Sequence, residues 1–190
     1  MKNIILIIVL LISVSAVPTK KQGKWIVGAG SQLLISGKTN VNSFTCSILH
    51  YNHVDTLGYT VKNKELIFDE NLIAIPVHEF DCGNRLITKD LRRTVKADQQ
   101  PYLYIAFISL NKNLNTNHAI AKMEIRLAGV AKSIDVPLSL DANGELLELS
   151  GSQEISFKDF KLVAPRHLLG MVKVQQELNV VFNLVIKPIL

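Results

Sequence analysis

The sequence lacks the motifs that most often identify an enzyme. No Gly-x-Ser-x-Gly nucleophile elbow occurs in its 190 residues. Residues 28–31 (Gly-Ala-Gly-Ser) lack the third glycine and the strand-to-helix context of a dinucleotide loop, and we interpret them as a turn. His50, His53 and Asp55 carry side chains that bind metals, but in an expected loop and without a helical i,i+4 pair. We therefore expect no enzymatic activity, no cofactor and no metal.

A long apolar run is found only at the beginning of the chain. Lys2 is followed by uninterrupted apolar residues at 4–12 and then by small residues up to Ala16, at the two positions that a signal peptidase inspects. A membrane span requires about 20 apolar residues, so this run is too short. We interpret residues 1–16 as a cleaved secretory signal peptide, with an uncleaved anchor as the alternative. The mature protein is expected in the periplasm or outside the cell, without a transmembrane span.

The sequence also lacks a large excess of charge of one sign. The chain has 21 basic and 16 acidic residues, and removal of residues 1–16 takes away one basic residue, Lys2. The remaining charge is spread out except for a cluster of four basic side chains at Lys89, Arg92, Arg93 and Lys96. A solvated helix face is the simplest interpretation of this cluster, and contact with an anionic head group is the alternative. We expect no nucleic-acid partner.

Cysteine is limited to Cys46 and Cys82, both in the part of the chain that we expect to be exported. An oxidising compartment favours joining such a pair. The chain-entropy estimate for closing a loop of about 36 residues is roughly 3 to 4 kcal/mol of stabilisation. A reactive thiol is the alternative, because Cys82 stands where a helix could begin and His78 lies four residues upstream. We expect the disulfide.

The dominant pattern of the chain is alternation of apolar and polar residues, which is typical of strands with one wet face. It is clearest at 121–127, and residues 141–144 supply a turn between two later strands. No linker or low-complexity tract interrupts the sequence, so we expect one domain at 24–190 after a flexible lead at 17–23. Further strands are predicted at 32–41, 44–49, 65–77, 102–110, 134–140, 147–157 and 177–187. The segment at 147–157 is either one long strand or a pair of strands.

Residues 80–97 interrupt this pattern with a short predicted helix. Ile87, Leu91 and Val95 share one helical face, and Asn84 can satisfy the free amides at the helix start. About eight strands without a second helical layer are compatible with two folds, a closed barrel or a sandwich. The barrel removes exposed strand edges, and at this size it is just wide enough to hold one small ligand. The helix would then cap one end of the barrel, and its apolar face would also pack as core.

Several segments are informative through their order and spacing: 36–46 (SGKTNVNSFTC), 80–85 (FDCGNR), 89–91 (KDL), 100–101 (QP) before the strand at 102–110, 127–130 (LAGV), and 158–160 (KDF) through 164–165 (AP) to Gly170. Together they resemble the YceI-like family, exported bacterial proteins that bind polyisoprenoid or other long apolar chains in a lipocalin-like barrel. The chain resembles the cysteine-paired branch, because it departs from many members at 77–82 and at 90–92. The resemblance implies an all-β fold, an antiparallel eight-stranded lipocalin-like barrel with a short helical cap.

The resemblance also implies an apolar tunnel inside the barrel. An empty cavity costs stability, so either a ligand or the side chains themselves must fill it, and the residues alone leave both readings open. Each methylene moved out of water contributes about 0.8 kcal/mol, so a long prenyl or acyl chain can bind without hydrogen bonds. The expected lining consists of large apolar residues on alternating strands: Phe44, Ile73, Ile75, Ile105, Phe107, Met123, Ile125, Leu138, Leu149, Phe157, Phe182 and Leu184.

The expected function is that of an exported binding protein with a long-chain isoprenoid or lipid in the barrel interior. The alternative is an envelope or stress-response accessory barrel that acts through its surface and has a filled core. The sequence leaves open whether the chain is a monomer or a homodimer, and which end of the barrel admits a ligand.

Overall fold

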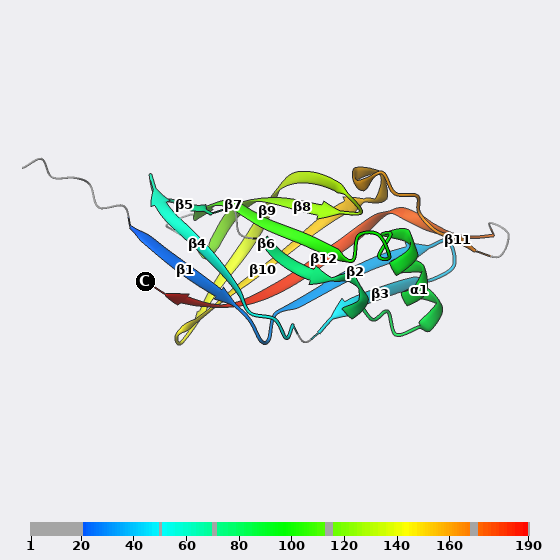
Figure 1. The fold of residues 1–190 in the computed structure, drawn as a ribbon, viewed down its shortest axis with the longest axis horizontal. Coiled ribbons are helices and arrows are strands. Elements are labelled where there is room, and N and C mark those ends of the chain that lie inside the picture. Colours follow the sequence, from blue (N-terminus) through cyan, green and yellow to red (C-terminus); the bar gives the residue numbers. More distant parts are fainter. Residues whose placement is uncertain (1–20, 50, 70–71, 113–115, 168–170, 190) are drawn as a thin grey trace, which may run out of the picture.

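A computed structural model describes residues 21–49, 51–69, 72–112, 116–167 and 171–189 of the chain. The fold is an antiparallel barrel, as predicted, and pairing between its first and last strands closes a ring of eight strands (Figure 1). The expected signal peptide lies outside the described residues. The ring consists, in order, of β1 (Gln22–Val27), β4 (Asp55–Lys62), β5 (Glu65–Phe68), β7 (Tyr102–Lys112), β8 (His118–Leu127), β9 (Val130–Asn143), β10 (Leu146–Ser156) and β12 (Val172–Ile189).

Two strands of the ring, β12 and β7, each pair with two partner strands in succession along one edge. β12 pairs with β1 near its C-terminal end and with β2 (Gln32–Thr39) along its earlier half. In the same way, β7 pairs with β5 and with β6 (Leu72–Pro76). β2 continues into a hairpin with β3 (Ser43–Ile48), and the two-residue β11 (Arg166–His167) pairs with the start of β12. In the described sheet β3 and β6 share no ladder, so the barrel wall has a gap between them.

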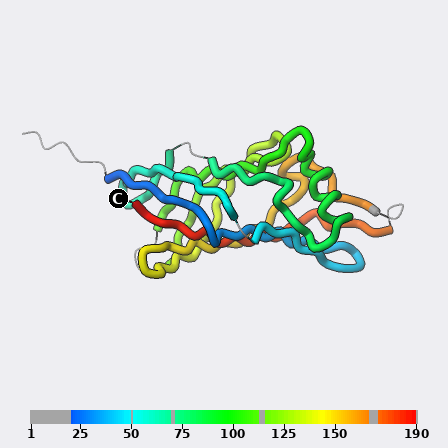
Figure 2. The backbone as a smooth tube through the Cα atoms, turned by 60° about the horizontal axis from the view of Figure 1, so that its bottom comes forward, coloured from blue at the N-terminus to red at the C-terminus, as the bar shows by residue number. Residues whose placement is uncertain are grey.

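The gap is bridged by a disulfide and by the segment that follows β6. Ser47 and Asp81 exchange backbone hydrogen bonds of 2.8 and 3.0 Å, and the neighbouring Cys46 and Cys82 form the predicted disulfide. The described chain therefore has no free thiol that could act with His78. The bridging segment contains the 3-10 helix η1 (Val77–Glu79) and the helix α1 (Arg85–Thr94). Figure 2 shows α1 at the end of the barrel opposite the chain's C-terminus.

The helix α1 forms as the sequence predicted. The side-chain oxygen of Asn84 accepts hydrogen bonds from the amides of Leu86 and Ile87, at 2.8 and 3.3 Å, which satisfies two donors at the helix start. Ile87 and Leu91 pack against the core, and Val95 is buried. The helix therefore covers the barrel end with its apolar face. Among the described residues, no helix combines the length and the apolar composition needed to cross a membrane.

The opposite end of the barrel is filled by aromatic side chains. The ring of Trp25 lies 5.8 Å from that of Tyr59 and 5.1 Å from that of Phe68, and Phe68 lies 5.4 Å from Phe107. All four side chains are buried, and their tilted or edge-to-face arrangements are favourable beyond the area that they bury. We call this group the aromatic plug. Because the aromatic plug occupies this end, an interior cavity is expected toward the α1 end.

Two strands and one break depart from the sequence-based prediction. β4 was not predicted, because Gly58 interrupts the apolar alternation between Leu57 and Tyr59. β1 was also missed, and it begins at Gln22, two residues before the predicted domain start. The single strand predicted at 65–77 is instead the two strands β5 and β6. The break follows Phe68: the amide of Asp69 still donates to the carbonyl of Gly58 on β4, whereas the next strand, β6, pairs with β7 and has no ladder with β4 in the described sheet.

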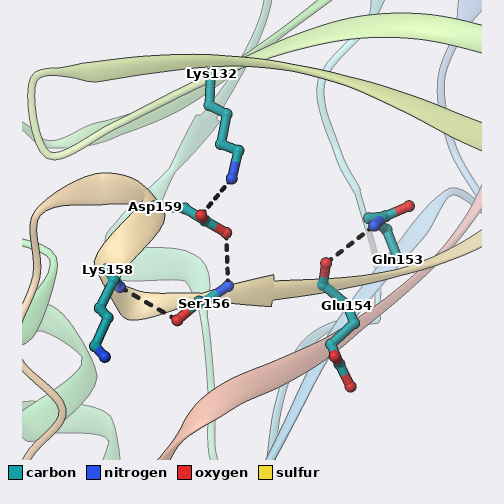
Figure 3. A network of polar contacts seen from close by, with 6 residues as sticks. All are labelled: Lys132, Gln153, Glu154, Ser156, Lys158 and Asp159. Carbon is teal, nitrogen blue, oxygen red and sulfur yellow. Dashed lines mark hydrogen bonds and ion pairs between the residues drawn. The ribbon is translucent and has the colours of Figure 1, made fainter.

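A polar network fixes the chain where β10 ends. Asp159, on the 3-10 helix η2 (Phe157–Phe160), accepts a 2.9 Å hydrogen bond from the amide of Ser156, and the Ser156 hydroxyl accepts one from the amide of Lys158 (Figure 3). Lys132 on β9 forms an ion pair with the Asp159 carboxylate. The carboxylate therefore fixes a loop.

This network predicts a pH dependence. The hydrogen-bonded Lys132 ammonium and then the Ser156 amide hold the pKa of Asp159 below its usual range. Because the folded pKa is the lower one, the stabilisation is present above the unfolded value of about 3.9 and is lost as pH falls through the folded pKa. We expect Asp159→Asn to lower the free energy of unfolding by less than about 1 kcal/mol at pH 7, with the difference from wild type vanishing in acid. Urea unfolding at several pH values checks this, and a difference that does not change with pH would contradict it.

Candidate ligand-binding site

The barrel encloses an apolar cavity of about 100 Å³ on the side of α1. Of its 21 lining residues, only Gln32 and Gln153 have polar side chains. The Gln153 amide nitrogen donates a 3.0 Å hydrogen bond to the backbone oxygen of Glu154 (Figure 3). Such a space favours apolar groups over water, because a buried water needs two to four polar partners. Seven of the residues predicted from the sequence line it: Ile73, Ile75, Ile105, Met123, Ile125, Phe182 and Leu184.

A second, open space adjoins the cavity. This groove of about 430 Å³ runs between α1, the β2–β3 hairpin and the start of β12. Phe44 and Phe157 of the predicted set line the groove rather than the cavity. Ile35 and Leu91 line both spaces, so these two partly buried side chains stand between the groove and the cavity. The cavity thus lies next to the surface at the α1 end.

Three residues of the predicted set lie elsewhere. Phe107 and Leu149 belong to the packed core and line neither the cavity nor the groove. Leu138 is also a core residue, 2% exposed, and borders a broad hollow on the outer face of the barrel. The alternation of β7, β9 and β10 places all three inward, as expected, but at levels of the barrel where other side chains fill the space.

Several lining residues were missed by the sequence analysis. Leu33 and Ile35 on β2 and Val180 on β12 belong to short runs in which neighbouring residues on both faces are apolar, so the period of two is hidden. Ile134 and Val136 on β9 did show the alternation, but were read only as strand residues. Alternation identifies the inward face of a strand, and position along the barrel axis decides which inward residues meet the cavity.

Basic side chains surround the outer face of α1. Arg92 donates a 2.6 Å hydrogen bond from its guanidinium to the backbone oxygen of His78, which fastens α1 to η1. Arg93 pairs with Asp90 at 2.7 Å. In the described part of the chain, Arg85 and Lys89 form no ion pair, and both line an open surface depression beside Asn84. The depression, which shares Asn84 with the groove, is thus lined by the basic side chains of α1 together with Asp81 and Asp98.

The histidine-containing loop before β4 forms local polar contacts. The buried Tyr51 hydroxyl donates to the Asp55 carboxylate, and His53 Nε2 lies 2.9 Å from Glu79 Oε1. Burial, followed by the hydrogen bond to Asp55, raises the pKa of Tyr51 well above its usual value. His50 lies outside the described residues. No group of three or more His, Cys, Asp or Glu side chains is placed to hold a metal ion within the described ranges.

Comparison with known proteins finds solved structures with a similar fold. No protein-family model and no curated protein matches the sequence. BcnA of Burkholderia cenocepacia is similar with a TM-score of 0.59 and 15% sequence identity, covering 82% of this chain and 95% of that chain. The YceI protein of Campylobacter jejuni is similar with a TM-score of 0.52 and 16% identity, over 62% of this chain and 71% of that chain. The chain therefore has a YceI-like fold, the antiparallel barrel described above.

Proposed function

We propose that this protein is an exported binding protein, without enzymatic activity, that holds a long apolar chain such as an isoprenoid or another lipid. The observation that carries the proposal is the apolar cavity beside the α1 end, next to an open groove. The disulfide between Cys46 and Cys82 is compatible with export, and residues 1–16 have the pattern of a cleaved signal peptide.

The sizes of the two spaces favour a ligand that uses both. An apolar cavity of about 150 Å³ holds a molecule of the size of benzene, so the interior space of about 100 Å³ takes only the end of a chain. The groove of about 430 Å³ would take a longer part. A continuous path between the two requires Ile35 and Leu91 to change rotamer. Burial of about ten methylenes would then contribute roughly 8 kcal/mol before the costs of ordering the chain.

The alternative is a barrel that acts through its surface. It is favoured by the outer hollow of about 1150 Å³, which spans β7, β8, β9, β10 and β12 and is lined largely by small and polar residues such as Ser109, Ser139 and Ser150. Native mass spectrometry with organic extraction, on protein purified without detergent, separates the two functions. A long-chain apolar species near one per chain supports the carrier. Protein that carries no such species and does not bind added prenyl or fatty chains favours the surface-acting barrel.

Filling the cavity should prevent binding. Ile125 lines the cavity on β8, and a tryptophan in its place would occupy the space that a chain needs. We expect Ile125→Trp to weaken the affinity for a dansyl-labelled fatty acid at least tenfold, measured by fluorescence titration. Overpacking costs about 1 to 3 kcal/mol, so circular dichroism must first show that the variant is folded.

The matched control is Ile120→Trp. Ile120 lies on the same strand, but its side chain faces outward and is 58% exposed. This variant should bind the labelled fatty acid as the wild type does. A folded Ile125→Trp variant with wild-type affinity would refute the assignment of the cavity.

A further inference from the structure

We propose that the α1 end of the barrel docks on an anionic lipid membrane. The surface, which we call the docking end, consists of the described residues of three segments that flank the groove: 35–46, 81–98 and 157–178. Figures 1 and 2 both show α1, the β2–β3 hairpin and the start of β12 together at this end.

Charge is the first argument for the membrane. The three segments contain 10 of the chain's 21 basic residues but only 5 of its 16 acidic residues. They therefore carry a net charge of +5, equal to that of the whole chain, and the rest of the sequence is balanced with 11 residues of each sign. A basic side chain near an anionic leaflet strengthens binding roughly fivefold, and the attraction acts only within a Debye length. Such an asymmetry would orient the barrel with the groove facing the lipid.

Exposed apolar side chains at the same end are the second argument. Leu86 lines the groove and is 72% exposed, although it lies on the helix that covers the barrel. Val41 and Met171, each 67% exposed, lie across the groove. The side chain of Asn40 holds them together, because it donates to the Met171 carbonyl at 2.8 Å and accepts from the Lys173 amide at 2.9 Å. Exposed apolar groups within a basic surrounding are the combination by which proteins bind membrane interfaces.

The opposite end of the barrel provides a control. The aromatic plug fills it, and outside the three segments the sequence has equal numbers of basic and acidic residues. Lys62 and Lys64 lie there, exposed, around the turn between β4 and β5. They offer a matched control, because reversing them changes the net charge as much as reversing two residues of α1. Membrane binding driven only by total charge would respond equally to both changes.

The first experiment measures sedimentation of the purified protein with vesicles. We expect at least tenfold tighter binding to phosphatidylcholine vesicles with one quarter phosphatidylglycerol than to pure phosphatidylcholine vesicles at 50 mM salt. Arg85→Glu with Lys89→Glu should weaken the binding to anionic vesicles at least tenfold. Lys62→Glu with Lys64→Glu should weaken it less than threefold. Absence of binding to anionic vesicles, or an equal loss in both pairs, would overturn the proposal, and the first outcome would leave an acidic protein as the partner to test.

The second experiment tests contact with the lipid. The single native tryptophan, Trp25, is 3% exposed, so a tryptophan introduced on the surface can be followed separately. Leu86→Trp should show a blue-shifted emission on anionic vesicles. Leu146→Trp, at a 40% exposed position at the start of β10, should not. A shift in neither variant or in both would overturn docking by the α1 end. Vesicle binding needs no ligand in the cavity, so this proposal and the proposed function can fail separately.

Discussion

Phe107→Ala is expected to lower the free energy of unfolding by about 3 to 5 kcal/mol. Phe107 is 2% exposed, and its ring packs against Phe68 in the aromatic plug. Truncation removes the transfer free energy of the ring and leaves a void that the closed barrel wall cannot collapse to fill. Urea denaturation followed by circular dichroism measures the change. Phe107→Leu, which leaves a smaller void, should cost clearly less.

The same variant distinguishes the two ends of the barrel. The sequence analysis placed Phe107 among the ligand contacts, whereas in the structure it lines neither the cavity nor the groove. We therefore expect Phe107→Ala, under conditions where it is folded, to bind the dansyl-labelled fatty acid with wild-type affinity. A folded variant that has lost this affinity would show that the binding site extends into the plug.

Replacing both cysteines should lower the free energy of unfolding by about 3 to 4 kcal/mol. The disulfide closes a loop of 36 residues and joins β3 to the segment that carries α1. Across the gap between β3 and β6, the described hydrogen bonds between β3 and this segment are the two backbone bonds between Ser47 and Asp81. Cys46→Ala with Cys82→Ala therefore removes the covalent link at the weakest part of the barrel wall. Urea denaturation of the oxidised protein and the variant checks the value.

Hydrogen exchange tests which part of the fold is destabilised when the disulfide is lost. The amides of α1 should exchange faster in the double variant, while those in the β8–β9 ladder should keep their protection under native conditions. Wild-type protein reduced with dithiothreitol serves as the control without substitutions and should behave like the variant. Unchanged exchange in α1 would mean that helix packing through Ile87 and Leu91, rather than the disulfide, holds the cap in place.

The features that could be predicted from the sequence are those determined by near neighbours. The alternation at 121–127, the Asn84 cap and the helical face of Ile87, Leu91 and Val95 each depend on residues a few positions apart, and the structure has all of them. β4 escaped prediction because its regularity comes from its partners: its inward residues are buried against β1 and β5, while its own sequence contains a glycine at the centre.

The lining of the cavity could be predicted only in part, because it depends on contacts between distant segments. Ile105 and Phe107 follow the same alternation on β7, and both point inward. Ile105 pairs with Ile125 at the level of the cavity, whereas Phe107 reaches the ring of Phe68 on β5. No local pattern distinguishes these two positions. The level of each residue along the barrel axis is determined by strand pairing between residues far apart in the sequence.

The pairing of β12 with β10, β1 and β2 has a consequence for how the chain folds. β12 is the last strand of the described chain, and it supplies the hydrogen-bonding partner for β10, for β1 and for β2. During synthesis from the N-terminus, those three strands keep unpaired edges until β12 has been made. Such edges are sites of aggregation. The barrel is therefore a fold that must be completed in one late step, and a chaperone that shields strand edges would act before β12 has docked.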